Sequence, residues 1–318
     1  MRWVSALLAG FLLLGNASAQ GDYPTRPVKV IVPSPPGGGT DILARVLAQH
    51  LSKALGQPFF VENKAGAGNM IGIEFVAHAA ADGYTVLLVP STLVLNSVLY
   101  KKVPYDPVRD FAPITLLGAA PYLLVVHPTL PAKSIREFIA LAKSKPNELR
   151  FSSSGNGSGA HLAAAMLDSM TGTKTTHIPY KGAGQAMPDL IAGQVQFSYV
   201  TYTAAGPFVR TGRLRALGVT SARRSAALPD LPAISEVVPG YDAQVWYGIA
   251  APAGTPSDII TRLNGEAKRA LNHPDMGQRL ITEAFEPIGS TPEYLGNYIK
   301  SEIVRWGAIV KASGAQVD

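Results

Sequence analysis

The sequence predicts an α/β protein with two lobes, each a mixed or mostly parallel sheet with flanking helices, and a cleft between them. Three observations support this fold class. Short β-branched runs alternate with helix-length amphipathic segments, two proline-rich breaks enclose a complete middle set of such elements, and glycine-rich loops follow predicted strands in both halves. Alternation of this kind favours parallel sheets covered by helices. The 318 residues, 47% of them hydrophobic, suffice for two lobes.

Short segments rich in β-branched or aromatic residues are the expected strands, because such side chains suit a pleated, half-buried surface. They are Val28–Val32, Phe59–Glu62, Tyr84–Val89, Tyr122–His127, Arg150–Ser153, Thr175–Ile178, Val195–Val200, Leu214–Val219 and Val245–Ala250.

The expected helices carry recognisable starts and stops. Ile42–Leu55 has an apolar face with period 3.6, and Gly56 ends it. Three further helix starts have a cap residue: Ser134 with Glu137 three positions on, Thr255 before Pro256, and Thr291 before Pro292.

Two proline-rich stretches, Lys101–Ile114 and Ser221–Ile234, predict the boundaries between the lobes. We expect residues 22–114 and 231–318 to form a discontinuous first lobe. Residues 115–230, including the hinge crossings, would form the second. Two chain crossings between two α/β lobes make a hinge, and the hinge makes a cleft.

The N-terminus predicts export. Arg2 precedes the apolar run Ala6–Gly15, and Ala17–Ala19 is a small-residue cleavage site. This pattern is typical of a secretory signal peptide, residues 1–19, cleaved after Ala19, and the run is too short to span a bilayer. There is no cysteine, so we expect neither disulfides nor a lipid anchor. The expected location is the periplasm.

Several classes of function are disfavoured. The formal charge is +6, but no basic run interleaved with aromatic residues indicates a nucleic-acid surface. The sequence has no P-loop, no His-Glu-x-x-His, no close histidine pair and no Gly-x-Ser-x-Gly elbow. We therefore expect no catalytic residue, no metal, no cofactor and no enzymatic activity.

One loop has a spacing close to that of dinucleotide sites. In Phe151–His161, Gly155, Gly157 and Ala160 match Gly-x-Gly-x-x-Gly/Ala, but no acidic residue lies about twenty positions on to hold a ribose. The physics that remains is general. Glycines expose backbone N–H groups, and a helix N-terminus adds positive potential for an anion.

The stretch "PSPPGGGTD" (Pro33–Asp41) has the same physics. Prolines fix the path of the loop, Gly37–Gly39 can present N–H groups, and Thr40 or Asp41 can cap the following helix. A third candidate is "HIPYKGAGQAMPDLIAG" (His177–Gly193), in which Lys181 could face an anion or could equally be a solvated loop lysine.

A set of motifs along the mature chain resembles the tripartite tricarboxylate transporter receptors, often called Bug-type solute-binding proteins. The motifs are "RPVKVIVPSPPGGGTDILAR", "VENKAGAGNMIG", "AADGYTVLL", "VPYDPVRDFAPI", "SSSGNGSGAHLA", "HIPYKGAGQAMPDLIAGQV", "GRLRALGVTSARR" and "APAGTPSDIITRLN". The resemblance implies a type II periplasmic binding-protein fold that closes on a small di- or tricarboxylate, an amino-acid-like acid or an aromatic acid.

The resemblance also implies a set of ligand-binding residues and the partners. The ligand would be delivered to the membrane permease subunits of a tripartite tricarboxylate-type transporter, and we expect a monomer. The implied binding residues are Ser34, Gly37, Gly38, Gly39, Thr40 and Asp41 in the first lobe, with Ser91 and Thr92 lining the cleft, and Ser153, Ser154, Gly157, Ser158, His161, Lys181, Gly182, Thr201 and Tyr202 in the second.

The chain departs from the family pattern at two positions. Ser34 stands where an aromatic residue is usual, which implies a more polar or roomier pocket. Pro188 in "AMPDL" stands where a helix former is usual, so we expect that helix to start later. Two alternatives stay open: an exported hydrolase or transferase using Ser158 and His161, and a sensor that docks on a signalling receptor.

Overall fold

The computed structural model describes residues 23–37, 39–180, 182–282 and 284–313, and the signal-peptide prediction lies outside them. Its strands pair in the order β2-β1-β3-β9-β4-β7-β5-β6, with β8 and β10 also paired to β4. The strands are β1 (Val28–Val32), β2 (Phe59–Asn63), β3 (Thr85–Pro90), β4 (Phe111–Val126), β5 (Arg150–Ser153), β6 (Thr176–Pro179), β7 (Phe197–Thr201), β8 (Arg215–Val219), β9 (Gln244–Pro252) and β10 (Glu286–Pro287).

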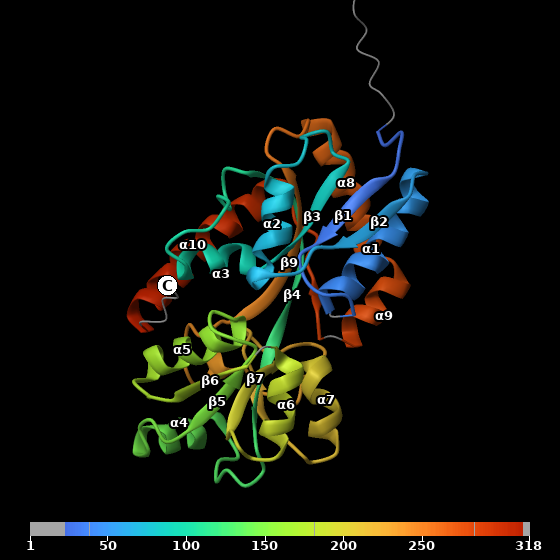
Figure 1. The fold of residues 1–318 in the computed structure, drawn as a ribbon. Helices are drawn as coiled ribbons and strands as arrows, with labels where there is room; N and C mark the ends of the chain where they lie inside the picture. Colours follow the sequence, from blue (N-terminus) through green and yellow to red (C-terminus); the bar gives the residue numbers. More distant parts are fainter. Residues whose placement is uncertain (1–22, 38, 181, 283, 314–318) are drawn as a thin grey trace, which may run out of the picture.

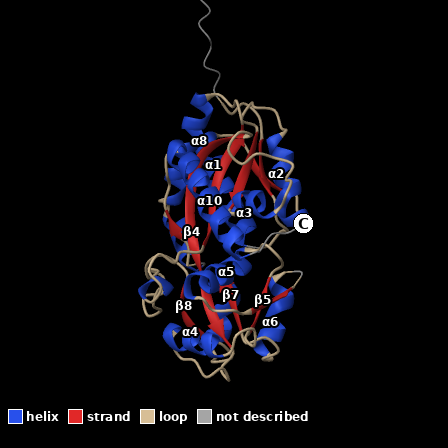
Figure 2. Ribbon diagram, turned by 90° about the vertical axis from the view of Figure 1, so that its left-hand side faces the viewer, coloured by secondary structure: helices blue, strands red, loops and turns tan. Residues whose placement is uncertain are grey.

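Helices flank the sheets in both halves of the molecule (Figures 1 and 2). The mixed sheet with flanking helices confirms the predicted α/β class. The first half carries α1 (Gly39–Leu55), α2 (Met70–Ala77), α3 (Thr92–Leu99), α8 (Ser257–Leu271), α9 (Pro274–Thr282) and α10 (Pro292–Ser313), and the second carries α4 (Ile135–Ser144), α5 (Gly159–Thr171), α6 (Ala183–Ile191) and α7 (Tyr202–Arg210). No helix in the described part of the chain is both long and apolar enough for a membrane span.

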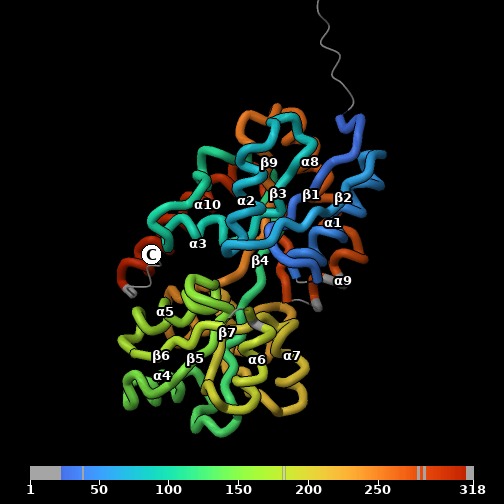
Figure 3. The backbone as a smooth tube through the Cα atoms, viewed as in Figure 1, coloured from blue at the N-terminus to red at the C-terminus, as the bar shows by residue number. Residues whose placement is uncertain are grey.

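Strand β4 belongs to both sheets. Its first part, up to Pro121, pairs with β9, whereas Tyr122 to Val126 pair with β7 and β8. Figure 3 shows the backbone running along β4 from one half of the molecule to the other. The prediction of a loop-rich break extending to Ile114 is wrong at its end, because β4 begins at Phe111. This part of the strand was not predicted because it contains Pro113 and Gly118, residues that disfavour strands. Both lie at register shifts, where such residues are tolerated.

The division into lobes at residues 115 and 230 remains a proposal. In the structure, the partners of β4 change at Tyr122, and the chain re-enters the first sheet at Gln244 in β9.

Two of the three predicted helix caps form in the structure, and the third does not. Ser134 Oγ accepts a hydrogen bond from the Glu137 N–H at 3.2 Å, and Thr291 Oγ1 accepts one from the Tyr294 N–H at 3.2 Å, so both caps are confirmed. Gly56, with φ of 70°, ends α1 as predicted. The Thr255 cap is wrong, because its hydroxyl donates to the Pro252 carbonyl instead.

The expectation for Pro188 is also wrong. Helix α6 begins at Ala183 and contains the proline.

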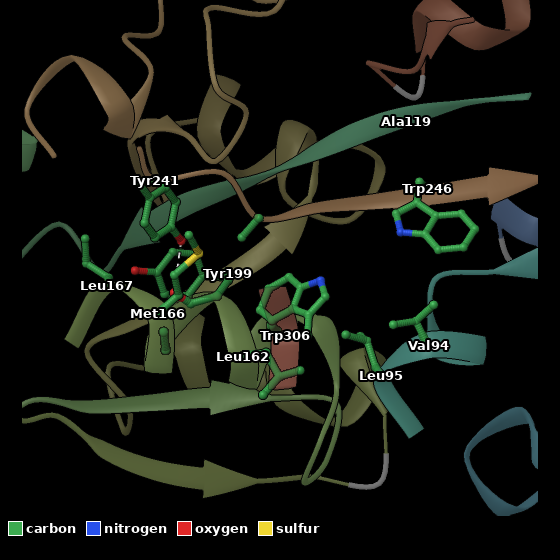
Figure 4. Close-up of a cluster of buried hydrophobic side chains, with 14 of the residues drawn as sticks. Val94, Leu95, Ala119, Leu162, Met166, Leu167, Tyr199, Tyr241, Trp246 and Trp306 are labelled. Carbon is green, nitrogen blue, oxygen red and sulfur yellow. Dashed lines mark hydrogen bonds between the residues drawn. The ribbon is translucent and has the colours of Figure 1, made fainter. Parts of the chain in front are cut away.

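Apolar packing continues across the two halves on the side of α10. Trp306 of α10 and Trp246 of β9 belong to the same buried cluster as Leu162 of α5 (Figure 4). Helix α10 contacts both α3 and α5. Glu302, 3% exposed, accepts hydrogen bonds from both indole N–H groups. This helix therefore packs against both halves of the molecule.

Candidate ligand-binding site

The loop between β1 and α1 is organised by one buried carboxylate, that of Asp41. Its Oδ2 accepts hydrogen bonds from the Gly37 N–H and from Arg45 Nε, both at 2.9 Å, and its Oδ1 accepts one from Asn63 Nδ2 at 2.9 Å. Asn63 Nδ2 also donates to the Ser34 carbonyl at 3.0 Å. Burial alone would raise the pKa of Asp41, but these hydrogen bonds outweigh it and hold the pKa below its ordinary value.

In the structure, two of the predicted residues of this loop form a hydrogen bond with each other. The Gly37 N–H, expected to face a ligand, donates to Asp41. Asp41, expected to bind ligand or to cap the following helix, is the third residue of α1, and its carboxylate holds the preceding loop. Gly37 has φ of 87°, a conformation that favours glycine. Ser34 Oγ is buried and has no hydrogen-bond partner among the described atoms.

Helix α2 fixes the other side of the loop. A Cβ at Gly72 would lie 2.7 Å from Pro33 Cα and 2.8 Å from the Lys64 carbonyl oxygen. The absent side chain lets α2 approach the loop backbone directly. The start of α1 is thus held in place by packing as well as by Asp41.

The corresponding loop of the second half centres on Ser153. Its hydroxyl accepts from the Gly155 N–H at 3.1 Å and lies 2.6 Å from His177 Nε2. The His177 ring stacks on His161, with centroids 4.0 Å apart, and on Phe151 at 4.8 Å. Burial, with a smaller contribution from His161, lowers the pKa of His177 to about 4, and burial also lowers the pKa of His161. Both histidines therefore favour the neutral form at neutral pH.

The residues that the hydrolase alternative needs serve the helix start instead. Ser158 Oγ caps α5 by accepting from the His161 backbone N–H at 3.3 Å, and His161 Nδ1 accepts from the Gly157 N–H at 3.1 Å. Each group is thus used in a local backbone hydrogen bond. The arrangement is that of a capped helix start.

The remaining predicted residues lie at strand ends, in loops or at the starts of helices. The Ser91 N–H donates to the Trp246 carbonyl at 3.0 Å, and Thr92 Oγ1 accepts from Asn69 Nδ2 at 2.8 Å. Thr201 ends β7, and Tyr202 begins α7. Ser154 is exposed in the loop after β5, Thr40 is partly buried in α1, and Gly182 precedes α6. Gly38 and Lys181 lie outside the described residues.

A cavity of about 240 Å³ brings together parts of both halves. Of the predicted residues, Gly37 and Gly39 line it from the first half, and Thr201 lines it from the second. The other described candidates are not among its lining residues. The remaining walls, which the sequence did not single out as a site, come from Ile42, Leu43, Val46, Ala120, Thr203, Ala204, Val245, Tyr247, Met276, Leu280 and Phe285.

These walls were missed because apolar side chains at helical spacing are normally core. Leu43 and Val46 were assigned to the buried face of α1, and they both pack in the core and border the cavity. A short helix could have been predicted here from the sequence. Pro274 is a typical helix start, and the apolar residues Met276 and Leu280 follow it four positions apart.

The fold and the cavity define a two-lobed α/β binding protein. The sequence model of the family described as tripartite tricarboxylate transporter family receptor matches residues 43–315, so the chain belongs to this family. Receptors of this family are periplasmic and bind solutes. The BugT protein of Bordetella pertussis is 39% identical over 298 residues, 93% of this chain and 91% of that protein.

Solved structures agree in fold. An R. palustris protein solved with adipate has a TM-score of 0.83 and 36% identity over 92% of this chain and 99% of its own. MatC from Rhodopseudomonas palustris, solved with bound malate, has a TM-score of 0.78 and 33% identity over 91% of this chain and 100% of its own.

Proposed function

We propose that this receptor captures a small carboxylate in the cavity between its two halves and delivers it to the permease of a tripartite tricarboxylate-type transporter. The observation that carries the proposal is that Gly37 and Gly39 border the same cavity as Thr201 and Thr203 of the other half. A ligand that contacts both halves stabilises the arrangement in which they are close, which is the basis of cleft closure.

Helix geometry supports a negatively charged ligand. Helix α1 has 17 residues and starts at Gly39, beside the cavity. The first N–H groups of a helix have no partner within it and carry positive potential. Asp41 lies near this end, but Arg45 pairs with its carboxylate at 2.9 Å, which reduces its repulsion of an incoming anion. Helix α7 starts at Tyr202, between two residues that line the cavity.

The relatives support the class of ligand. One similar structure was solved with adipate and another with malate, both of which are small carboxylates. We carry the other sequence-predicted positions into this proposal as further cleft residues: Ser34, Gly38, Thr40, Asp41, Ser91, Thr92, Ser153, Ser154, Gly157, Ser158, His161, Lys181, Gly182 and Tyr202. The proposal includes export, with residues 1–19 removed after Ala19. N-terminal sequencing of the protein from the periplasmic fraction should begin at Gln20.

A thermal-shift panel tests the proposal. Each mono-, di- and tricarboxylate and each aromatic acid is paired with its neutral amide, so that shape is kept and charge is removed. A ligand that binds only the folded protein raises the unfolding midpoint. We expect at least one acid to raise the midpoint while its amide does not. A panel in which no acid has an effect, or in which amides act as well as acids, contradicts carboxylate capture.

A further inference from the structure

The cavity beside Gly37 and Gly39 is apolar over most of its wall. Its lining includes side chains from α1, from strands β4 and β9, and from α9 together with Phe285. The apolar lining residues are Ile42, Leu43, Val46, Ala120, Ala204, Val245, Tyr247, Met276, Leu280 and Phe285.

The side chains of the apolar end are buried or partly buried, apart from Ile42, which is exposed. Met276 is fully buried, Leu280 and Phe285 are each 5% exposed, and Ile42 is 37% exposed. The rings of Tyr247 and Phe285 stack with centroids 6.0 Å apart. The cavity therefore combines the two loop glycines with a mostly apolar, partly aromatic lining.

The chemistry of this interior disfavours a second charge. Among the described residues that line the cavity, no side chain is ionisable except the tyrosine. A second carboxylate placed against Met276, Leu280 and Phe285 would lose its hydration, and these side chains offer neither a cation nor hydrogen-bond donors, which makes the placement costly. A hydrocarbon body gains from the same surroundings. The volume of about 240 Å³ equals that of about eight waters, enough for a ring or a short chain.

We propose that the preferred ligand is a monocarboxylate with an aliphatic body, a medium-chain acid. Its carboxylate meets the glycine loop at the start of α1, and its body fills the cavity against α9. This inference rests on the proposed carboxylate-binding function and narrows its substrate class. It also makes Leu280 and Met276 specificity-determining residues.

Calorimetric titration of the full mature chain with acids of matched length tests the inference. Hexanoate and adipate have the same number of carbons and differ at one end, which is a methyl group or a carboxylate. We expect affinity to rise about fourfold for each methylene from butyrate to hexanoate. We expect hexanoate to bind at least about tenfold more tightly than adipate.

The outcomes separate this inference from the proposed function. Saturable binding of adipate as tight as that of hexanoate, or affinity independent of chain length, overturns the apolar-ligand inference and leaves carboxylate capture standing. Failure of every carboxylate to bind overturns both.

A matched pair of variants on α9 locates the apolar body. Leu280→Lys places a cation in the cavity, so the preference should shift from hexanoate toward adipate by at least about tenfold. Ile281→Lys, at the next residue, changes a side chain that is 63% exposed and does not line the cavity, so the preference should not move. A folded Leu280→Lys protein with unchanged preference overturns the placement against α9.

If circular dichroism shows that Leu280→Lys is unfolded, Val46→Ala tests the opposite wall. Removing two methyl groups from α1 enlarges the cavity, so the preferred chain should lengthen beyond hexanoate. An unchanged optimum overturns the placement.

Discussion

The Gly37 N–H donates to the carboxylate of Asp41 at 2.9 Å, so a side chain on the first turn of α1 holds the loop that precedes it. The same carboxylate accepts from Arg45 and Asn63. A buried acceptor with three donors acts as a local framework, and the loop it supports borders the proposed carboxylate site.

Asp41→Ala should destabilise the protein by about 1–3 kcal/mol, because the loop amide and the Asn63 side chain lose their acceptor. Ligand affinity should fall as well, since the start of α1 is no longer held. Urea unfolding and titration with the best ligand from the acid panel measure the two effects. As a control, Glu148→Ala removes a carboxylate that is 65% exposed and should change stability by less than about 0.5 kcal/mol. Equal losses in the two variants would mean that the Asp41 network has no special role.

Gly72→Ala should displace the Pro33 loop, because the new Cβ would lie 2.7 Å from Pro33 Cα, and backbone atoms cannot move aside as a flexible side chain can. We expect a lower unfolding midpoint and weaker ligand binding. The matched control is Gly265→Ala in α8, where the nearest atom to the new Cβ is an arginine end 3.7 Å away. Removing that helical glycine should stabilise the protein by roughly 0.5–1 kcal/mol. If both variants gain stability, α2 does not fix the loop.

The acid sensitivity of the protein should depend on His177. Its pKa is about 4 in the folded protein and 6.5 ordinarily, so the unfolded chain binds more protons between these values. Stability should therefore be independent of this group above pH 6.5, should fall as the pH drops from 6.5 to 4, and should level off below that. His177→Phe keeps a ring beside Phe151 and removes the titration. Its unfolding midpoint should fall less over this pH window than that of the wild type, and an identical fall would exclude His177 as a source.

Glu302 links Trp246 and Trp306, whose indole N–H groups each lie 3.0 Å from its Oε2. Glu302→Ala should cost about 3–5 kcal/mol, because Arg305 and both indoles lose their buried partner. The exposed Lys300 on the same helix provides the comparison, and Lys300→Ala should lie within about 0.5 kcal/mol of wild type. Denaturant unfolding followed by tryptophan fluorescence reads both changes. A loss below about 1 kcal/mol for Glu302→Ala would show that the link carries little energy.

The sequence was informative where local chemistry decides structure. Val28–Val32 and Arg150–Ser153 were predicted with their exact ends, because β-branched or aromatic runs bounded by turn residues have few alternatives. The first part of β4 was hidden, since Pro113 and Gly118 argue against a strand when pairing partners far along the chain are unknown.

Part of the site was predicted because its residues follow or end predicted strands. Gly37, Gly39 and Thr201 follow or end predicted strands, and the carboxyl ends of parallel strands are where ligands bind in α/β folds. The hydrogen bonds of Asp41 and the apolar cavity wall formed by α9 could not be predicted, because both depend on which segments meet in space. Met276 and Leu280 look like ordinary core until the structure brings them to the same cavity as the glycine loop.

A crystal structure of the protein with the acid identified by mass spectrometry after gentle purification tests the central claim most directly. The account predicts a carboxylate within hydrogen-bond distance of the N–H groups at the start of α1, with the ligand also contacting the Thr201–Thr203 segment of the other half. A ligand without a carboxylate, or one bound away from the cavity shared by Gly39 and Thr201, would contradict it.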